Sequence, residues 1–123
     1  MARKKSRKKI VEGIVDACKN VGMYRTDFLP VIEDLADAMI QRDKTWEEFE
    51  ESGGKSMVSY TNKAGAENLV KNPLLVLWND QNKTVLAYRR ELGLTPAGLK
   101  KLNEKAMQAP KKNALNEALK KLG

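Results

Sequence analysis

The sequence predicts an all-α domain of several helices, with either a small β-hairpin or an ordered loop near residues 55–70. Apolar residues recur at spacings of three and four along most of the chain, as they do on one face of a helix. Capping residues, prolines and glycines stand where such stretches begin and end. The 123 residues are 41% hydrophobic and 32% charged, which is typical of one folded domain with a modest core.

The first helix is expected from Ile10 onward, because Ile10, Ile14 and Cys18 recur at four-residue spacing on one face. Gly22 is placed to end it. Cys18 is the only cysteine, so it cannot form an internal disulfide. We expect it to act as a small core residue in a reducing compartment.

A second helix is expected to begin at Thr26 or Asp27, either of which can cap it, and to continue to Ile40. A short third helix is expected from Thr45 to residue 52, where two glycines follow. Its predicted start rests on Thr45 and Glu48, which have the spacing of a capping box. Helical periodicity then stops until residue 70, which favours the hairpin or loop.

Asn72 and Pro73 predict the start of a long helix, since Asn is a good cap and Pro suits the first helical position. Gly93 is expected to end this helix, and Thr95 to begin another that runs to Met107. The apolar residues of the long helix are assigned to the core or a subunit interface: Leu74, Trp78, Val85, Tyr88 and Leu92.

The predicted organisation has three parts. Residues 1–9 form a flexible basic arm, residues 10–107 a helical core and oligomerisation domain, and residues 108–123 a linker with a Lys-rich C-terminal helix. That last helix is too short to be stable alone and is expected to need a partner.

Charge is segregated along the chain. The net charge is +7, but residues 1–9 carry six basic and no acidic residues, a charge of +6. Residues 10–52 carry four basic and eleven acidic residues, a charge of −7, and residues 53–123 carry thirteen and five, a charge of +8. Clusters of Lys and Arg favour binding to nucleic acids through counterion release. A solubilising terminus, or contact with the acidic block of another copy, are the alternative interpretations.

Several chemistries are excluded by residue type. The chain has no histidine, which removes His-based nucleophile pairs, imidazole bases and His-ligated zinc. Gly54-Lys55-Ser56 resembles the end of a phosphate-binding loop, but Phe49 stands where that motif needs glycine. The acidic residues of segment 47–51 fan out around one short helix instead of converging on a metal ion. We therefore predict no catalytic residues, no metal site and no cofactor.

The segment from Tyr88 to Leu102 has the spacing of two helices joined by a tight turn with glycine. It fits a DNA-reading helix-turn-helix, although Arg89 stands where a small residue normally lets the helices cross closely. A simple αα-corner with a solvated lysine face is equally compatible. The candidate DNA-binding residues are Arg3, Lys4, Lys5, Arg7, Lys8, Lys9, Arg89, Arg90, Lys100, Lys101 and Lys105.

The order of these elements, with Asn72-Pro73 and the segment Arg90-Glu91-Leu92-Gly93-Leu94-Thr95-Pro96, resembles the small terminase subunits of tailed bacteriophages. One departure is that the family usually has a basic residue soon after the proline, where this chain has Gly98 and Leu99. The resemblance implies a non-enzymatic DNA-packaging component that forms a ring of identical subunits. It implies binding to double-stranded viral DNA at the packaging start and delivery to the large terminase subunit, which holds the ATPase and nuclease.

Two other functions fit the same residues. A dimeric helix-turn-helix regulator would bind two half-sites about one helical turn apart. A basic protein that only scaffolds other proteins would not bind DNA at moderate salt. No secretory signal or membrane span is recognised, and the longest apolar run, residues 74–78, is far too short to cross a bilayer. The expected location is the host cytoplasm, without a membrane partner.

Overall fold

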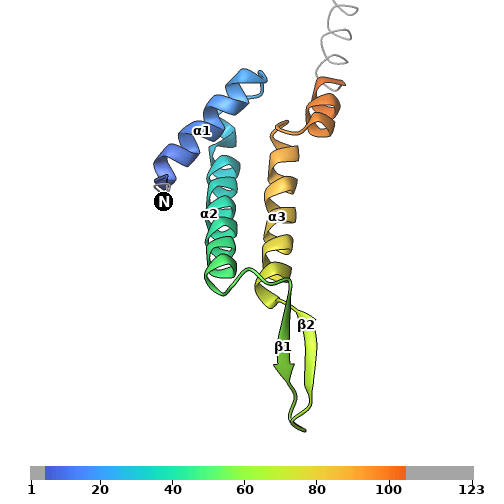
Figure 1. Cartoon of the computed structure of the whole chain (residues 1–123). Coiled ribbons are helices and arrows are strands. Elements are labelled where there is room, and N and C mark those ends of the chain that lie inside the picture. Colours follow the sequence, from blue (N-terminus) through green and yellow to red (C-terminus); the bar gives the residue numbers. More distant parts are fainter. Residues whose placement is uncertain (1–4, 105–123) are drawn as a thin grey trace, which may run out of the picture.

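The computed structural model describes residues 5–104 and is mostly helical, with one small hairpin (Figure 1). The expected all-α fold with a small β-hairpin is therefore confirmed. The elements are α1 (Arg7–Asn20), the short 3-10 helix η1 (Thr26–Phe28), α2 (Leu29–Glu51), β1 (Met57–Thr61), β2 (Glu67–Lys71) and α3 (Pro73–Glu91). A further helical segment, helix 96–104, follows α3.

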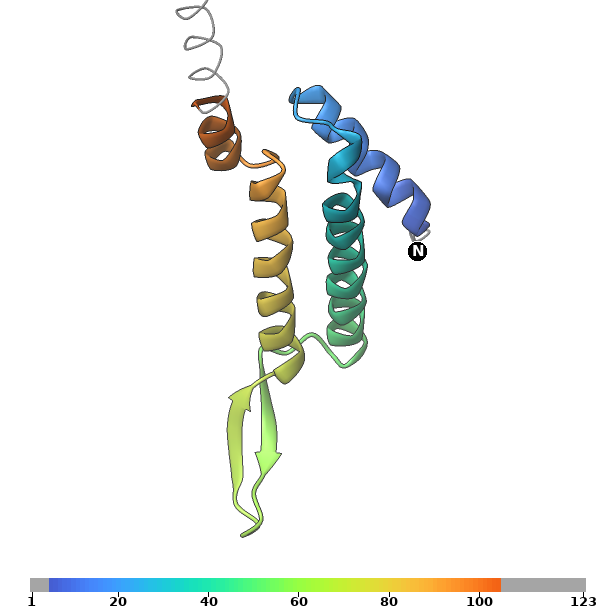
Figure 2. The ribbon, with the colours of Figure 1, turned by 180° about the vertical axis from the view of Figure 1, so that it is seen from behind.

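The helices α2 and α3 run side by side in opposite directions, and α1 packs on α2 (Figures 1 and 2). The buried core lies where the three helices come together. It is small, as expected for a chain of this length. Its buried members are Ile14, Cys18, Ile32, Leu35, Ala36, Val85 and Leu92.

Helix α1 begins three residues earlier than the sequence predicted. The Ser6 hydroxyl accepts a hydrogen bond from the Lys9 amide at 3.3 Å, which is an N-cap. Residues 7–9 therefore belong to the helix and not to a flexible arm. Gly22 follows the helix with a φ of +73°, as its predicted role as a terminator requires.

The predicted break at Thr45 is wrong, because α2 is one continuous helix of 23 residues. Thr45 is buried inside it, and its hydroxyl donates to the carbonyl oxygen of Gln41, one turn earlier, at 3.1 Å. A threonine can satisfy its hydroxyl in this way within a helix. The start is also later than predicted, because Thr26 and Asp27 lie in η1.

The strands β1 and β2 form an antiparallel hairpin that extends beyond the helices (Figure 1). At its tip the side-chain oxygen of Asn62 accepts hydrogen bonds from the amides of Ala64 and Ala66, both at 3.0 Å. Gly65 adopts a φ of +84° in the same turn. The strands pack mainly on each other, and no described helix packs extensively on them.

The predicted start of α3 is confirmed. The Asn72 side chain accepts a hydrogen bond from the Leu74 amide at 3.0 Å and donates one to the Lys55 carbonyl at 2.9 Å. Asn72 thereby caps α3 and joins it to the segment entering β1. Trp78 of α3 contacts Trp46 of α2, with ring centroids 5.1 Å apart, which closes this end of the helix pair.

Candidate nucleic-acid interface

A groove of about 850 Å³ lies between α1 and the segment that follows α3. Its apolar lining includes Ile14 of α1 and Leu35 of α2. Three cationic side chains also line it: Lys5 and Lys9 from the start of the chain, and Arg89 from the end of α3. The sequence placed these cations in two basic blocks on either side of an acidic one. The fold brings members of both blocks to one groove.

Arg89 is half-buried, and within residues 5–104 the only hydrogen bond of its side chain is the one that it donates, over 4.0 Å, to the sulfur of Met39. Burial lowers the pKa of Arg89, and the positive charge of Arg42 lowers it further. No carboxylate within the described range forms an ion pair with Arg89. Its charge is therefore only weakly compensated, which favours an anion nearby.

Arg42 is a neighbour of Arg89 that the sequence analysis missed. It pairs with Asp43 at 3.0 Å and donates to the side-chain oxygen of Asn82 at 3.0 Å, which links α2 to α3. In the sequence Asn82 lies 40 residues after Arg42, whereas Asp43 is the next residue. Neither spacing carries a helical or strand pattern, so periodicity offered no signal for Arg42.

Arg7, a predicted DNA contact, already has an anionic partner inside the chain. Its guanidinium donates to both carboxylate oxygens of Asp37, at 2.7 and 3.3 Å. This pairing raises the pKa of Arg7 and lowers that of Asp37. Both side chains are exposed, so the pair is accessible to solvent and ions. Arg7 therefore anchors the start of α1 to α2.

The turn between α3 and helix 96–104 depends on two glycines. Gly93 has a φ of +73°, and a Cβ added there would lie 3.0 Å from Leu102. Gly98 is buried, and an added Cβ would collide with the carbonyl oxygen of Arg90. The close approach of the two helices thus occurs at Gly98. A larger side chain, basic or not, cannot fit at Gly98 in this arrangement.

Helix 96–104 is capped by Thr95, whose hydroxyl accepts a hydrogen bond from the Gly98 amide at 3.0 Å. Lys100 and Lys101 are exposed on this helix. Lys101 and Arg90 line a second, smaller hollow of about 220 Å³. The predicted pair of helices with a tight glycine turn is therefore present. Both a DNA-reading motif and a simple αα-corner have this arrangement of two helices.

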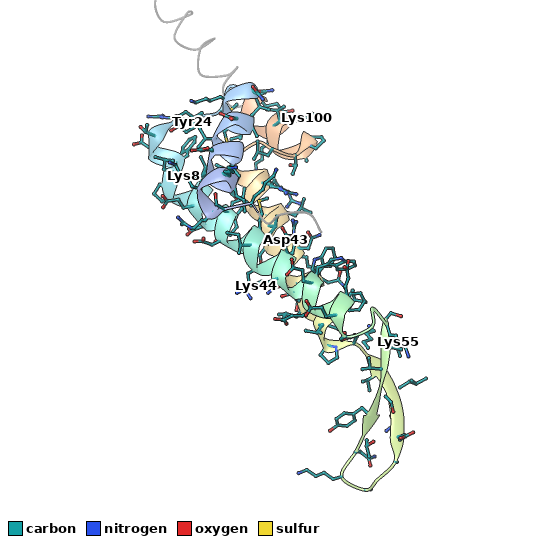
Figure 3. The ribbon with its side chains drawn as sticks, turned by 60° about the vertical axis from the view of Figure 1, so that its left-hand side comes forward. Lys8, Tyr24, Asp43, Lys44, Lys55 and Lys100 are labelled. Atoms are coloured by element: carbon teal, nitrogen blue, oxygen red, sulfur yellow. The ribbon has the colours of Figure 1, made fainter. Side chains whose placement is uncertain are left out.

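The predicted cations do not all lie together. Figure 3 shows Lys8 and Lys100 towards the α1 end of the molecule, whereas Lys55 lies at the hairpin end. Lys5, Lys9 and Arg89 share the groove, and Arg90 and Lys101 share the second hollow. Three predicted contacts lie outside the described residues: Arg3, Lys4 and Lys105.

The exposed side of α2 is unsuited to a polyanion. Between residues 29 and 51 the chain has eight acidic and two basic residues. Most of the acidic side chains are exposed. Repulsion from these carboxylates disfavours phosphate along α2. Cations outnumber carboxylates in the groove and on helix 96–104, and also in segment 53–71, which has three lysines and one glutamate.

Neither a metal site nor a membrane span is found in the part of the chain that the structure describes. No three His, Cys, Asp or Glu side chains within residues 5–104 are grouped so as to hold a metal ion. Over the same residues no helix is both long enough and apolar enough to cross a bilayer.

Comparison with known proteins identifies a family. The family model described as phage terminase, small subunit, matches residues 8–109, which include every described helix and the hairpin. No curated protein and no solved structure matches the chain. Because the match covers most of the sequence, the chain belongs to the small subunit family of phage terminases.

Proposed function

We propose that this protein binds double-stranded viral DNA at the packaging start and delivers it to the large terminase subunit, without catalysing a reaction itself. The observation that carries the proposal is the gathering of cations from both ends of the described chain. Lys5, Lys9 and Arg89 line one groove, and the exposed Lys100 and Lys101 lie on the helix beside it. Family membership supports the role in packaging.

The proposed contacts are to phosphate and not to bases. Lysine is a flexible point charge, whereas base readout relies on Arg, Asn and Gln with fixed, bidentate geometry. Helix 96–104 carries Lys100, Lys101 and a single amide side chain, Asn103. We expect these lysines to position DNA with little sequence preference. Sequence preference for the packaging start would then need contributions from other parts of the assembly.

We further propose that several copies form a ring in the host cytoplasm and that the ring docks on the large subunit. Heterologous contacts close into rings when the rotation between copies permits it. The acidic exposed side of α2 can face the basic regions of a neighbouring copy, which supports such an arrangement. Native mass measurement at micromolar concentration tests the ring, and a stable monomer would contradict it. Stimulation of the large subunit's ATPase tests the docking.

The DNA contacts are tested by the salt dependence of binding. Replacing Lys100 and Lys101 by alanine removes two phosphate contacts, so the slope of log K against log salt should fall by about 1.8. The matched control replaces Lys55 and Lys63, which removes the same charge at the hairpin end. Its slope should stay close to that of the unchanged protein. Equal effects of both double variants would show that only net charge matters, and the assignment to helix 96–104 would be wrong.

The basic arm needs a deletion that spares α1. Removing residues 2–5 eliminates Arg3, Lys4 and Lys5 but leaves the Ser6 cap and the Arg7–Asp37 pair in place. The salt slope should fall by up to about 2.7, with the fold unchanged by circular dichroism. A binding curve identical to that of the full chain at every salt concentration would remove the arm from the DNA interface.

The close packing of two helices around Gly93 and Gly98 is compatible with a second function, that of a dimeric DNA-binding regulator. This function predicts a dimer that binds two half-sites about one helical turn apart. It also predicts loss of sequence specificity when Lys100 and Lys101 are replaced. Size-exclusion chromatography with light scattering separates a dimer from a higher oligomer.

A further inference from the structure

The hairpin of β1 and β2 leaves hydrogen-bonding groups unpaired along both of its edges. The Asn62 amide donates to the Ala66 carbonyl at 3.0 Å, and the Asn72 amide donates to the Ser56 carbonyl at 2.8 Å. Hydrogen-bonded and non-hydrogen-bonded residue pairs alternate along an antiparallel ladder. Because these two bonds mark a hydrogen-bonded pair at each end of the hairpin, they determine which pairs between them are hydrogen-bonded. The backbone groups that point away from the partner strand belong to Met57, Ser59 and Thr61 of β1 and Glu67, Leu69 and Lys71 of β2.

Both faces of the hairpin also expose large apolar side chains. Leu69 is 73% exposed and Met57 is 44% exposed on one face, and Tyr60 is 56% exposed on the other. Within residues 5–104 the strands pack mainly on each other, and no helix packs extensively on them. A two-stranded hairpin alone is marginally stable in water, and exposed edges readily pair with another strand. The hairpin therefore has the properties of a sheet that is completed by a partner.

We propose that the hairpins of neighbouring copies pair edge to edge, β2 of one copy with β1 of the next, so that the assembly carries one continuous antiparallel sheet. This inference rests on the proposed ring. In a ring related by rotation about one axis, all hairpins point the same way. The β2 strand of one copy then runs opposite to β1 of its neighbour, which is the antiparallel arrangement. Closure around the ring leaves no free edge.

A second copy fits the hairpin better than DNA does. Each copy offers one free β1 edge and one free β2 edge, so the surface is complementary to itself. Three of the exposed side chains on the strands are large and apolar or aromatic, Met57, Tyr60 and Leu69, and a neighbouring hairpin would shield them from water. The strands themselves carry one acid, Glu67, and one base, Lys71, so they have no net charge, and the other two lysines of the hairpin lie before β1 (Lys55) and in the turn (Lys63), not on the strand edges. A strand pair that contacts phosphate would carry an excess of cations.

Hydrogen exchange on the unchanged full-length protein tests the pairing directly. In a separate hairpin the outward amides of Ser59 and Leu69 face solvent and exchange rapidly. In a paired sheet they are hydrogen-bonded, so their exchange should slow at least about a hundredfold in the assembled protein. The inward amides of Val58 and Val70 serve as internal controls, because the hairpin's own ladder protects them in both cases.

A proline variant gives an independent measurement. Ser59→Pro removes one outward amide without touching the ladder inside the hairpin, a position where edge strands accept proline. The concentration at which half the chains are assembled should rise at least about tenfold. Ser59→Thr keeps the amide and is the matched control, with assembly expected to be unchanged. If Ser59→Pro disrupts the hairpin, as loss of protection at Val58 would reveal, Leu69→Lys tests the β2 edge, which forms the other side of the same proposed interface.

The outcomes separate this inference from the proposed function. A ring by native mass with slow outward amides supports the pairing. A ring whose outward amides exchange at the rate of solvent-exposed groups overturns the pairing and leaves the ring intact. A monomer at every concentration overturns both. Protection that appears only when double-stranded DNA is added would overturn the pairing and make the hairpin a DNA contact.

Discussion

Gly98 offers the sharpest test of how helix 96–104 is attached to α3. Replacing Gly by Ala inside a helix normally stabilises it by up to about 1 kcal/mol. At Gly98, however, the added Cβ collides with the Arg90 carbonyl and lies 2.9 Å from the Thr95 hydroxyl oxygen. The obstacle is mainly backbone, which cannot rotate away. Overpacking of this kind costs roughly 1 to 3 kcal/mol, and the upper end, about 3 kcal/mol, less the helical gain of up to about 1 kcal/mol leaves a net cost of about 2 kcal/mol. Gly98→Ala should therefore destabilise the protein by about 2 kcal/mol.

Gly13→Ala is the matched control, because it makes the same substitution in α1, where no atom lies within 4 Å of the added Cβ. That variant should be more stable by about 0.5 to 1 kcal/mol. Urea unfolding followed by circular dichroism measures both, at one protein concentration because assembly adds to stability. If helix 96–104 detaches on its own, loss of exchange protection over residues 99–104 reports it. Equal stabilisation by both substitutions would refute the close approach at Gly98.

Two further predictions concern single side chains. The hydrogen bond and the charge of Arg7 lower the pKa of Asp37. The pair therefore stabilises the fold fully at pH values above the ordinary carboxyl pKa, and this stabilisation is lost as the pH falls through the lowered pKa of Asp37. Asp37→Asn should flatten the acid side of the curve of unfolding free energy against pH below about pH 4, and an unchanged curve would contradict the pairing. Cys18 is fully buried, and burial raises the pKa of its thiol. Its alkylation by iodoacetamide should be at least about a hundredfold slower in the native protein than in urea, and comparable rates would show that the core is open.

Most of the fold could be predicted because its signals are local. Asn72 and Pro73 mark the start of α3 through chemistry that acts within one turn, and the structure shows that cap. The error at Thr45 has a physical cause. The capping-box pattern is helpful only where the preceding backbone is not helical, and residues 41–44 contain no glycine or proline to end the helix. Buried in α2, Thr45 bonds to Gln41 and does not cap.

The candidate site was less predictable because it is built from distant residues. Arg89 contacts Met39, fifty positions earlier, and Arg42 bonds to Asn82 across the two helices. No periodicity relates such pairs. The sequence analysis named Lys5, Lys9, Lys100 and Lys101 as candidates from residue type alone, but residue type could not show that Arg7 would be paired with Asp37.

The charge blocks take on a different meaning in the folded chain. Along the sequence an acidic segment separates two basic ones, which suggests two independent DNA surfaces. In the structure the Arg7–Asp37 pair ties the first basic block to the acidic helix α2, and Lys9 of α1 and Lys5 just before α1 both line the groove that Arg89 also lines. The acidic block thus positions the cations instead of separating them. Asp37→Asn should consequently weaken DNA binding even though it removes a negative charge, whereas an effect of net charge alone predicts tighter binding. The sign of that change distinguishes a positioned interface from a generally basic surface.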